Sequence, residues 1–215
     1  RSILAGVPVI EKPGTATALP AWRTAEIIVN SGILPEGAYQ FICGSTGDLL
    51  DRLGVQDCMA FTGSASTGAY LKGNENLVKN NVRVNIEADS LNAAVLGPDV
   101  DSDSETYALF LRNVAVDMTQ KTGQKCTATR RILVPAELVE EVKADLVAEL
   151  GRTQVGDPSK RENRMGPLSS PRQFEDVKDG IAKLQEVAET ACGGPEALFE
   201  TGCYVAATLL VRSEE

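Results

Sequence analysis

The chain has 215 residues, of which 43% are hydrophobic and 5% aromatic, so it can bury a substantial core as one large or two smaller domains. Its net charge is −9, from 21 basic and 30 acidic residues that form no long single-sign runs, which argues against nucleic acid or an anionic membrane as the main partner. No apolar run approaches the ~20 residues that a membrane span requires.

The cysteine and histidine counts restrict the chemistry further. The five cysteines are an odd set without a CxxC pair, so neither a disulfide framework nor a zinc site is indicated, and no metal site is expected. Reduced thiols in the cytoplasm are the simpler interpretation. The chain contains no histidine, which excludes Cys–His and Ser–His–Asp schemes built from this chain alone.

The two ends predict a piece of a longer protein. The sequence begins at Arg1 rather than Met and stops after Glu215, where a new segment starts to form. Whether a targeting segment exists therefore stays open.

The first ninety residues alternate short β-branched runs with longer amphipathic ones, which is typical of a parallel sheet covered by helices. The strands are apolar at consecutive positions, so we expect them to be buried on both faces, with Cys43 and Cys58 as small buried residues. The expected strands are 7–10, 38–43, 58–62 and 82–86, and the expected helices are 19–31, 47–53 and 66–79.

A second α/β unit follows the acidic, hinge-like loop 97–105. Its apolar spacing predicts helices over 107–119, from Pro135 to Leu150 and over 174–187, with a strand at 132–134. Turns are expected at 155–158 and 165–168, and Cys192 and Cys203 are placed in loops. The apolar run 202–211 closes the chain with no partner after it.

Several residues of the first half stand where parallel sheets bind ligands, at the carboxyl ends of strands. Lys12 follows the first strand and could meet a ribose hydroxyl or a phosphate, or could be an ordinary solvated lysine. Gly44 opens a Gly-Ser-Thr-Gly turn that is either a binding loop or a plain strand-to-helix connection. Gly63 and Ser64 precede a helix, where Ser64 either helps to hold a phosphate or is an N-cap.

Glu87 and Cys126 are the candidates for catalysis. Glu87 follows an apolar strand, so it is either a desolvated carboxylate suited to general-base chemistry or the first polar residue of a loop, and Asp89 competes for that role. Cys126 follows a Gly-Gln-Lys turn and precedes a small-residue run, which suits an accessible thiol. The alternative is a small buried hydrophobic residue.

Taken in order, these motifs resemble the aldehyde dehydrogenase superfamily along nearly the whole chain. The motifs are Lys-Pro after a strand, Phe-Thr-Gly-Ser, the strand-ending Glu, Gly-Gln-x-Cys, Gly-Asp-Pro, Met-Gly-Pro-Leu and Tyr-Val-x-x-Thr-Leu-Leu. The resemblance implies a Rossmann-type cofactor domain over residues 1–90 and an α/β catalytic domain over residues 91–215, both truncated.

The resemblance also implies roles for single residues. Cys126 matches the family's nucleophile and Glu87 its general base. Lys12 matches the lysine on the adenosine ribose side, and Gly63 with Ser64 matches the pyrophosphate-side turn. An aldehyde would then be oxidised to an acid with NAD(P)⁺ through a Cys126 thioester, in a cytoplasmic, homo-oligomeric full-length enzyme.

The chain departs from the common family pattern at two places. Most members have Glu-Leu-Gly-Gly where this chain has Glu87-Ala-Asp-Ser90, and Lys125 stands directly before Cys126. Both features are similar to the semialdehyde dehydrogenase modules of aerobic phenylacetate and benzoyl-CoA catabolism. That similarity implies a CoA-thioester semialdehyde as substrate and NADP⁺ as acceptor, with NAD⁺ as the alternative.

Other outcomes stay open at the level of the sequence. The family's oxyanion asparagine would lie before Arg1, and its Glu-x-Phe-Gly-Pro segment would lie beyond Glu215, so we expect this fragment alone to show little or no dehydrogenase activity. The alternatives are a CoA-acylating dehydrogenase and an inactive relative that serves as a binding or structural module.

Overall fold

The computed structural model describes residues 2–212; the chain ends on which the expectation of a longer protein rests lie outside that range. The chain divides into two compact units, Arg1–Asp89 and Ser90–Glu215. Across the described residues, no helix combines the length and apolar character needed to cross a bilayer.

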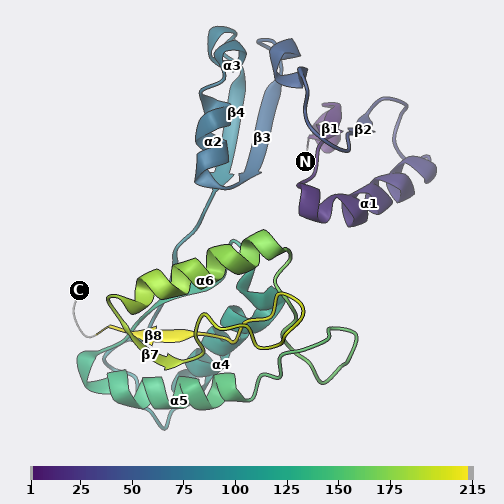
Figure 1. Cartoon of the computed structure of the whole chain (residues 1–215). Coiled ribbons are helices and arrows are strands. Elements are labelled where there is room, and N and C mark those ends of the chain that lie inside the picture. The colour runs from purple at the N-terminus through teal and green to yellow at the C-terminus, as the bar shows by residue number, and fades with distance from the viewer. Residues whose placement is uncertain (1, 213–215) are drawn as a thin grey trace. The chain divides into compact units, whose positions relative to one another are not determined.

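The first unit alternates strands with helices, as predicted. β1 pairs in parallel with β2, and β3 pairs in parallel with β4 (Figure 1). A short 3-10 helix, Leu49–Arg52, replaces the helix expected at 47–53. The elements are β1 (Val9–Glu11), α1 (Ala18–Asn30), β2 (Tyr39–Phe41), β3 (Cys58–Gly63), α2 (Ala65–Lys72), α3 (Glu75–Lys79) and β4 (Arg83–Ala88).

The single helix expected over 66–79 is two helices. Gly73 ends α2, and Asn74 begins α3 as an N-cap whose side chain accepts a hydrogen bond from the Leu77 N–H at 3.1 Å. An asparagine at this position satisfies a donor that a continuing helix would bond to its own backbone, so it favours a new helix start. The apolar periodicity did not reveal this break.

The strands of the first unit are not buried on both faces. Along β4, and over the first five residues of β3, half-buried and exposed residues alternate. α2 covers one face, since a Cβ at Gly68 would lie 2.7 Å from Ile86 Cγ2 and 3.8 Å from Phe61 Cε1. Cys58 and Glu87 belong to the opposite set of the alternation and are exposed.

The second unit holds two strand pairs and three long helices. β5 pairs in parallel with β6, and β7 pairs with β8 in antiparallel fashion. The sequence did not predict β5, and β8 gives the closing apolar run a partner that precedes it. The elements are β5 (Asn92–Val95), α4 (Glu105–Thr119), β6 (Thr129–Leu133), α5 (Val139–Gly151), α6 (Pro171–Gln185), β7 (Glu189–Cys192) and β8 (Leu209–Val211).

The main hydrophobic core lies in the second unit. It is formed by Leu96, Tyr107, Val114, Ala115, Val142, Leu146, Leu150 and Leu209. The Tyr107 hydroxyl donates to Asp145 Oδ2 at 2.8 Å and so joins α4 to α5. Burial, and secondarily this bond to Asp145, raises the pKa of Tyr107. A smaller cluster of Met165, Leu168 and Val205 holds the turn at 165–168.

Three cysteines differ from their predicted environments. Cys58 is exposed instead of buried because β3 pairs only with β4 in the described chain and does not lie inside a wide sheet. Cys43 is exposed because β2 ends at Phe41, which leaves Cys43 in the connection after the strand. Cys192 is the last residue of β7 rather than a loop residue, and its thiol lies 3.8 Å from the Ala207 carbonyl oxygen. Burial raises the pKa of the Cys192 thiol.

Leu146 provides a test of the second core. Leu146 is 1% exposed, so Leu146→Ala should lower the free energy of unfolding by about 2–5 kcal/mol through lost burial and a residual cavity. Urea unfolding of the protein measures this loss. Leu184→Ala on α6 is the matched control, because Leu184 is 54% exposed and should change stability by less than ~1 kcal/mol. Equal losses in the two variants would contradict the assigned core.

Candidate active site

The backbone before Cys126 makes an unusual turn. Lys121, Thr122 and Gly123 have φ of 54°, 58° and 67°, three successive residues in the left-handed region. Glycine adopts this region freely, but Thr122 is β-branched and disfavours it. The strain therefore lies in Lys121 and Thr122, directly before the Gly-Gln-Lys turn predicted from the sequence, and surrounding groups must hold these two residues.

The turn at 165–168 supplies part of that support. Thr122 Oγ1 donates to the Gly166 carbonyl at 3.1 Å, and the Ser169 N–H donates to Gln124 Oε1 at 2.9 Å. Gln124 Nε2 also donates to the Lys121 carbonyl at 3.1 Å. Two motifs that are separate in the sequence, Gly-Gln-x-Cys and Met-Gly-Pro-Leu, thus meet in the structure.

Cys126 has a fixed backbone and an exposed position. Its carbonyl accepts hydrogen bonds from Ser90 Oγ at 2.5 Å and from Asn92 Nδ2 at 2.7 Å. Asn92 Nδ2 also donates to the carbonyl of Ala128, which is 1% exposed. Cys126 itself is exposed, so it is not the small buried hydrophobic residue that the sequence left as an alternative. The arrangement presents a thiol from a constrained loop.

A carboxylate of α4 contacts the same loop. Asp117 Oδ2 accepts from the N–H and the hydroxyl of Thr129, both at 2.7 Å, and Oδ1 pairs with the Lys125 ammonium. Lys125 Nζ also donates to Gln120 Oε1 at 2.9 Å. The Lys125 ammonium, with the Thr129 donors, holds the pKa of Asp117 below its usual range although burial opposes this. Asp117 lies in none of the motifs that the sequence offered as candidate site residues.

A signal for Asp117 exists in the sequence. A carboxylate in the last turn of a helix is opposed by the helix dipole and needs cationic or N–H partners to stay there. Asp117 stands two residues before the end of α4, whose last turn carries no basic residue. Such a carboxylate indicates a partner from beyond the helix.

Glu87 lies within β4, opposite Thr62 of β3, and is exposed. It is therefore neither of the two alternatives taken from the sequence, a desolvated carboxylate or the first residue of a loop. The parallel pairing brings Glu87 to the same sheet edge as Gly63, which faces Ala88. A Cβ at Gly63 would lie 2.5 Å from the Phe61 ring, so the position suits glycine.

The start of α2 is occupied by side chains of the chain itself. Ser64 is the N-cap and accepts from the Thr67 N–H at 3.3 Å, while Asp89 Oδ2 accepts from the Ala65 N–H at 3.1 Å. A phosphate placed there would meet the Asp89 carboxylate. This end of α2 therefore fits a cofactor pyrophosphate less well than a bare helix N-terminus would.

Lys12 and Gly44 follow the carboxyl ends of β1 and β2, which are adjacent because the strands are parallel. Lys12 is exposed, and among residues 2–212 its ammonium donates only to the neighbouring Pro13 carbonyl, at 2.9 Å. Gly44 has φ of 105°, a conformation that favours glycine. An exposed cation beside a glycine turn fits a phosphate- or ribose-bearing cofactor.

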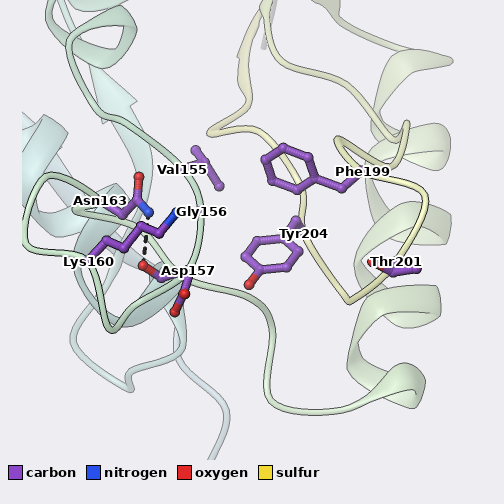
Figure 2. A pocket seen from close by; sticks show the side chains of 8 residues that line it. All are labelled: Val155, Gly156, Asp157, Lys160, Asn163, Phe199, Thr201 and Tyr204. Carbon is purple, nitrogen blue, oxygen red and sulfur yellow. Dashed lines mark hydrogen bonds between the residues drawn. The ribbon is translucent and has the colours of Figure 1, made fainter.

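An open hollow of about 410 Å³ lies in the second unit and contains none of these residues. Figure 2 shows the rings of Phe199 and Tyr204 on one side and Lys160, Asp157 and Asn163 on the other. The two rings pack edge to face with centroids 5.0 Å apart. Among residues 2–212, no group of three or more Cys, Asp and Glu residues is arranged to hold a metal ion.

Known proteins are similar to this chain in sequence and fold. A 3,4-dehydroadipyl-CoA semialdehyde dehydrogenase of Aromatoleum evansii is 44% identical over 193 residues, which cover 90% of this chain and 38% of that protein. A mutant of aldehyde dehydrogenase C from Pseudomonas syringae, solved with NAD⁺ and octanal, is 27% identical with a TM-score of 0.86. The Mycobacterium tuberculosis aldehyde dehydrogenase with NAD⁺ is 29% identical with a TM-score of 0.84.

These matches cover most of this chain but less than half of each relative. The two solved structures align with 97% of this chain, which spans 43% of the first and 42% of the second. The sequence matches the aldehyde dehydrogenase family over residues 1–215. The fold is that of an aldehyde dehydrogenase, and the chain belongs to the aldehyde dehydrogenase family.

Proposed function

We propose that the protein oxidises an aldehyde to a carboxylic acid with Cys126 as its nucleophile. The observation that carries this proposal is the exposed Cys126 on a loop whose carbonyl is held by Ser90 and Asn92, in a chain of this family. A nucleophile on a fixed backbone loses little freedom when it reacts, which lowers the barrier.

The residues then take the following roles. The Cys126 thiolate adds to the aldehyde carbon, and the Cys126 N–H donates to the oxyanion that forms. A nicotinamide cofactor, when bound, accepts the hydride. Glu87 removes a proton from water that attacks the thioester carbon; the C–S bond breaks and the Cys126 thiolate leaves. Residues 1–90 serve as the cofactor domain and residues 91–215 as the catalytic domain.

For the cofactor we favour NADP⁺. Lys12 would lie on the ribose side with Gly44, and Gly63 and Ser64 on the pyrophosphate side, where the Asp89 carboxylate must be accommodated. No carboxylate follows Lys12 within Gly14-Thr15-Ala16, so nothing in that segment repels a 2′-phosphate. The two solved relatives named above were determined with NAD⁺, which makes NAD⁺ the alternative.

For the substrate we favour a CoA-thioester semialdehyde of aromatic-acid degradation. The support is the 44% identity to the A. evansii enzyme, whose name specifies a CoA semialdehyde, together with the sequence similarity to modules of aromatic-acid catabolism. The five free thiols fit a reducing cytoplasm. The full-length enzyme is proposed to be a homo-oligomer.

Cys126→Ser in the full-length protein should reduce kcat by at least about a thousandfold, because a hydroxyl without a base is a poor nucleophile. Steady-state NADPH formation measures the loss. Cys58→Ser is the matched control, since Cys58 is also exposed, and should keep wild-type activity. Retained activity in Cys126→Ser would rule out the nucleophile.

Glu87→Gln should keep the first-turnover burst of NADPH and lose steady turnover by about 10²–10⁴-fold, because only hydrolysis needs the base. Stopped-flow absorbance separates the two phases. Asp89→Asn tests the competing carboxylate and should leave turnover within about threefold. Wild-type turnover in Glu87→Gln would exclude this role and reopen the CoA-acylating alternative.

Cofactor choice is tested at Thr15. Wild-type protein should give the higher kcat/KM with NADP⁺, and Thr15→Glu should lower that value at least about tenfold by repelling the 2′-phosphate. Thr15→Gln matches the size without the charge and should change it little. A higher kcat/KM with NAD⁺ in the wild type would contradict the preference.

A further inference from the structure

We propose that Asp117 and Lys125 form a positioning pair that fixes the Cys126 loop from the α4 side. The inference rests on the proposed role of Cys126 as nucleophile. Neither Asp117 nor Lys125 touches the reacting atoms; both act through the loop.

One carboxylate holds both ends of the loop. Its Oδ1 pairs with Lys125, directly before Cys126, and its Oδ2 accepts two hydrogen bonds from Thr129, three residues after it. Only Cys126, Thr127 and Ala128 lie between the two attachment points. The short connection leaves the cysteine backbone little freedom.

The opposite attachment comes from β5 and the residues before it. Ser90 and Asn92 both donate to the Cys126 carbonyl, and Asn92 also donates to the Ala128 carbonyl. Asp117 of α4 therefore holds the loop by the Lys125 and Thr129 side chains and the Thr129 N–H. Ser90 and Asn92 hold it by the carbonyls of Cys126 and Ala128. Loss of either attachment leaves the other unable to fix the thiol alone.

The Asp117–Lys125 pair is better shielded from water than the other ion pairs of the described chain. The Lys125 side chain is 14% exposed and that of Asp117 is 27% exposed, whereas each of the other pairs has a partner that is at least 63% exposed. Partly buried, multiply bonded charges hold one geometry more firmly than exposed pairs do. Displacing a nucleophile by as little as 1 Å can lower the rate about a hundredfold.

The experiment compares variants of the full-length enzyme by stopped-flow measurement of the first NADPH burst, with Tm recorded for each. Lys125→Met keeps the length of the side chain and removes its charge. It should slow the burst about 10- to 100-fold while KM for aldehyde and cofactor stays within about twofold. Lys125→Arg restores the pair and should recover the burst to within about threefold.

Lys143→Met is the matched control, because Lys143 pairs with Glu140 on α5 and its side chain is 24% exposed. It should leave the burst unchanged. Asp117→Asn should slow the burst as Lys125→Met does, and the double variant should be no slower than the slower single variant. Asp117→Asn keeps an acceptor for Thr129, so it carries the test if Lys125→Met does not fold.

Two results would overturn the positioning role: a wild-type burst in Lys125→Met or Asp117→Asn, or slowing in Lys143→Met equal to that in Lys125→Met. Failure of the proposed function gives a different result: either the wild type forms no NADPH, or Cys126→Ser keeps the burst. The two failures are therefore distinguished within one set of measurements.

Discussion

The left-handed turn before Cys126 is the constraint on which the candidate site depends. Thr122 and Lys121 adopt positive φ at a cost of order 1–3 kcal/mol each, so their conformation persists only where other contacts determine it. Those contacts come from the turn at 165–168, which is itself fixed by the buried cluster of Met165, Leu168 and Val205. The strained backbone near the nucleophile is thus held in place by a hydrophobic cluster more than forty residues away in sequence.

The sequence predicted well what periodicity and turn chemistry determine. The long helices α4, α5 and α6 follow from apolar spacing, and the parallel pairing of β3 with β4 follows from strand–helix alternation. The break between α2 and α3 was not predicted, because Asn74 acts through one local hydrogen bond inside an otherwise continuous apolar pattern. The predicted burial of Cys58 was wrong because an apolar strand does not reveal how many strands will lie beside it, and that of Cys43 was wrong because β2 ends before it.

The candidate site was predictable in its residues but not in its contacts. Cys126 and Glu87 stand out by motif, whereas Asp117 and the roles of Ser90 and Asn92 depend on side chains that meet across 12 to 36 residues of sequence. A single sequence carries no spacing rule for such contacts. Only the unfavourable position of a carboxylate at the end of α4 indicates that a partner exists.

The residues by which this chain departs from the common family pattern each take a defined structural role. Asp89 occupies φ of 50° where most members have glycine, which an aspartate tolerates better than most residues, and its carboxylate accepts from the start of α2. Ser90 replaces the second glycine and donates to the Cys126 carbonyl. Lys125 pairs with Asp117.

Asp89 and Ser90 restrict the backbone more than glycine would and add side-chain contacts. Glycine would make neither contact, whereas Asp89 bonds to the start of α2 within the first unit and Ser90 bonds to the Cys126 loop within the second. Each contact adds little alone, about 0.5–1.5 kcal/mol for an ordinary hydrogen bond. The Ser90 contact acts on the short Cys126 loop and limits the positions of its thiol, where a small loss of freedom has a large effect on rate.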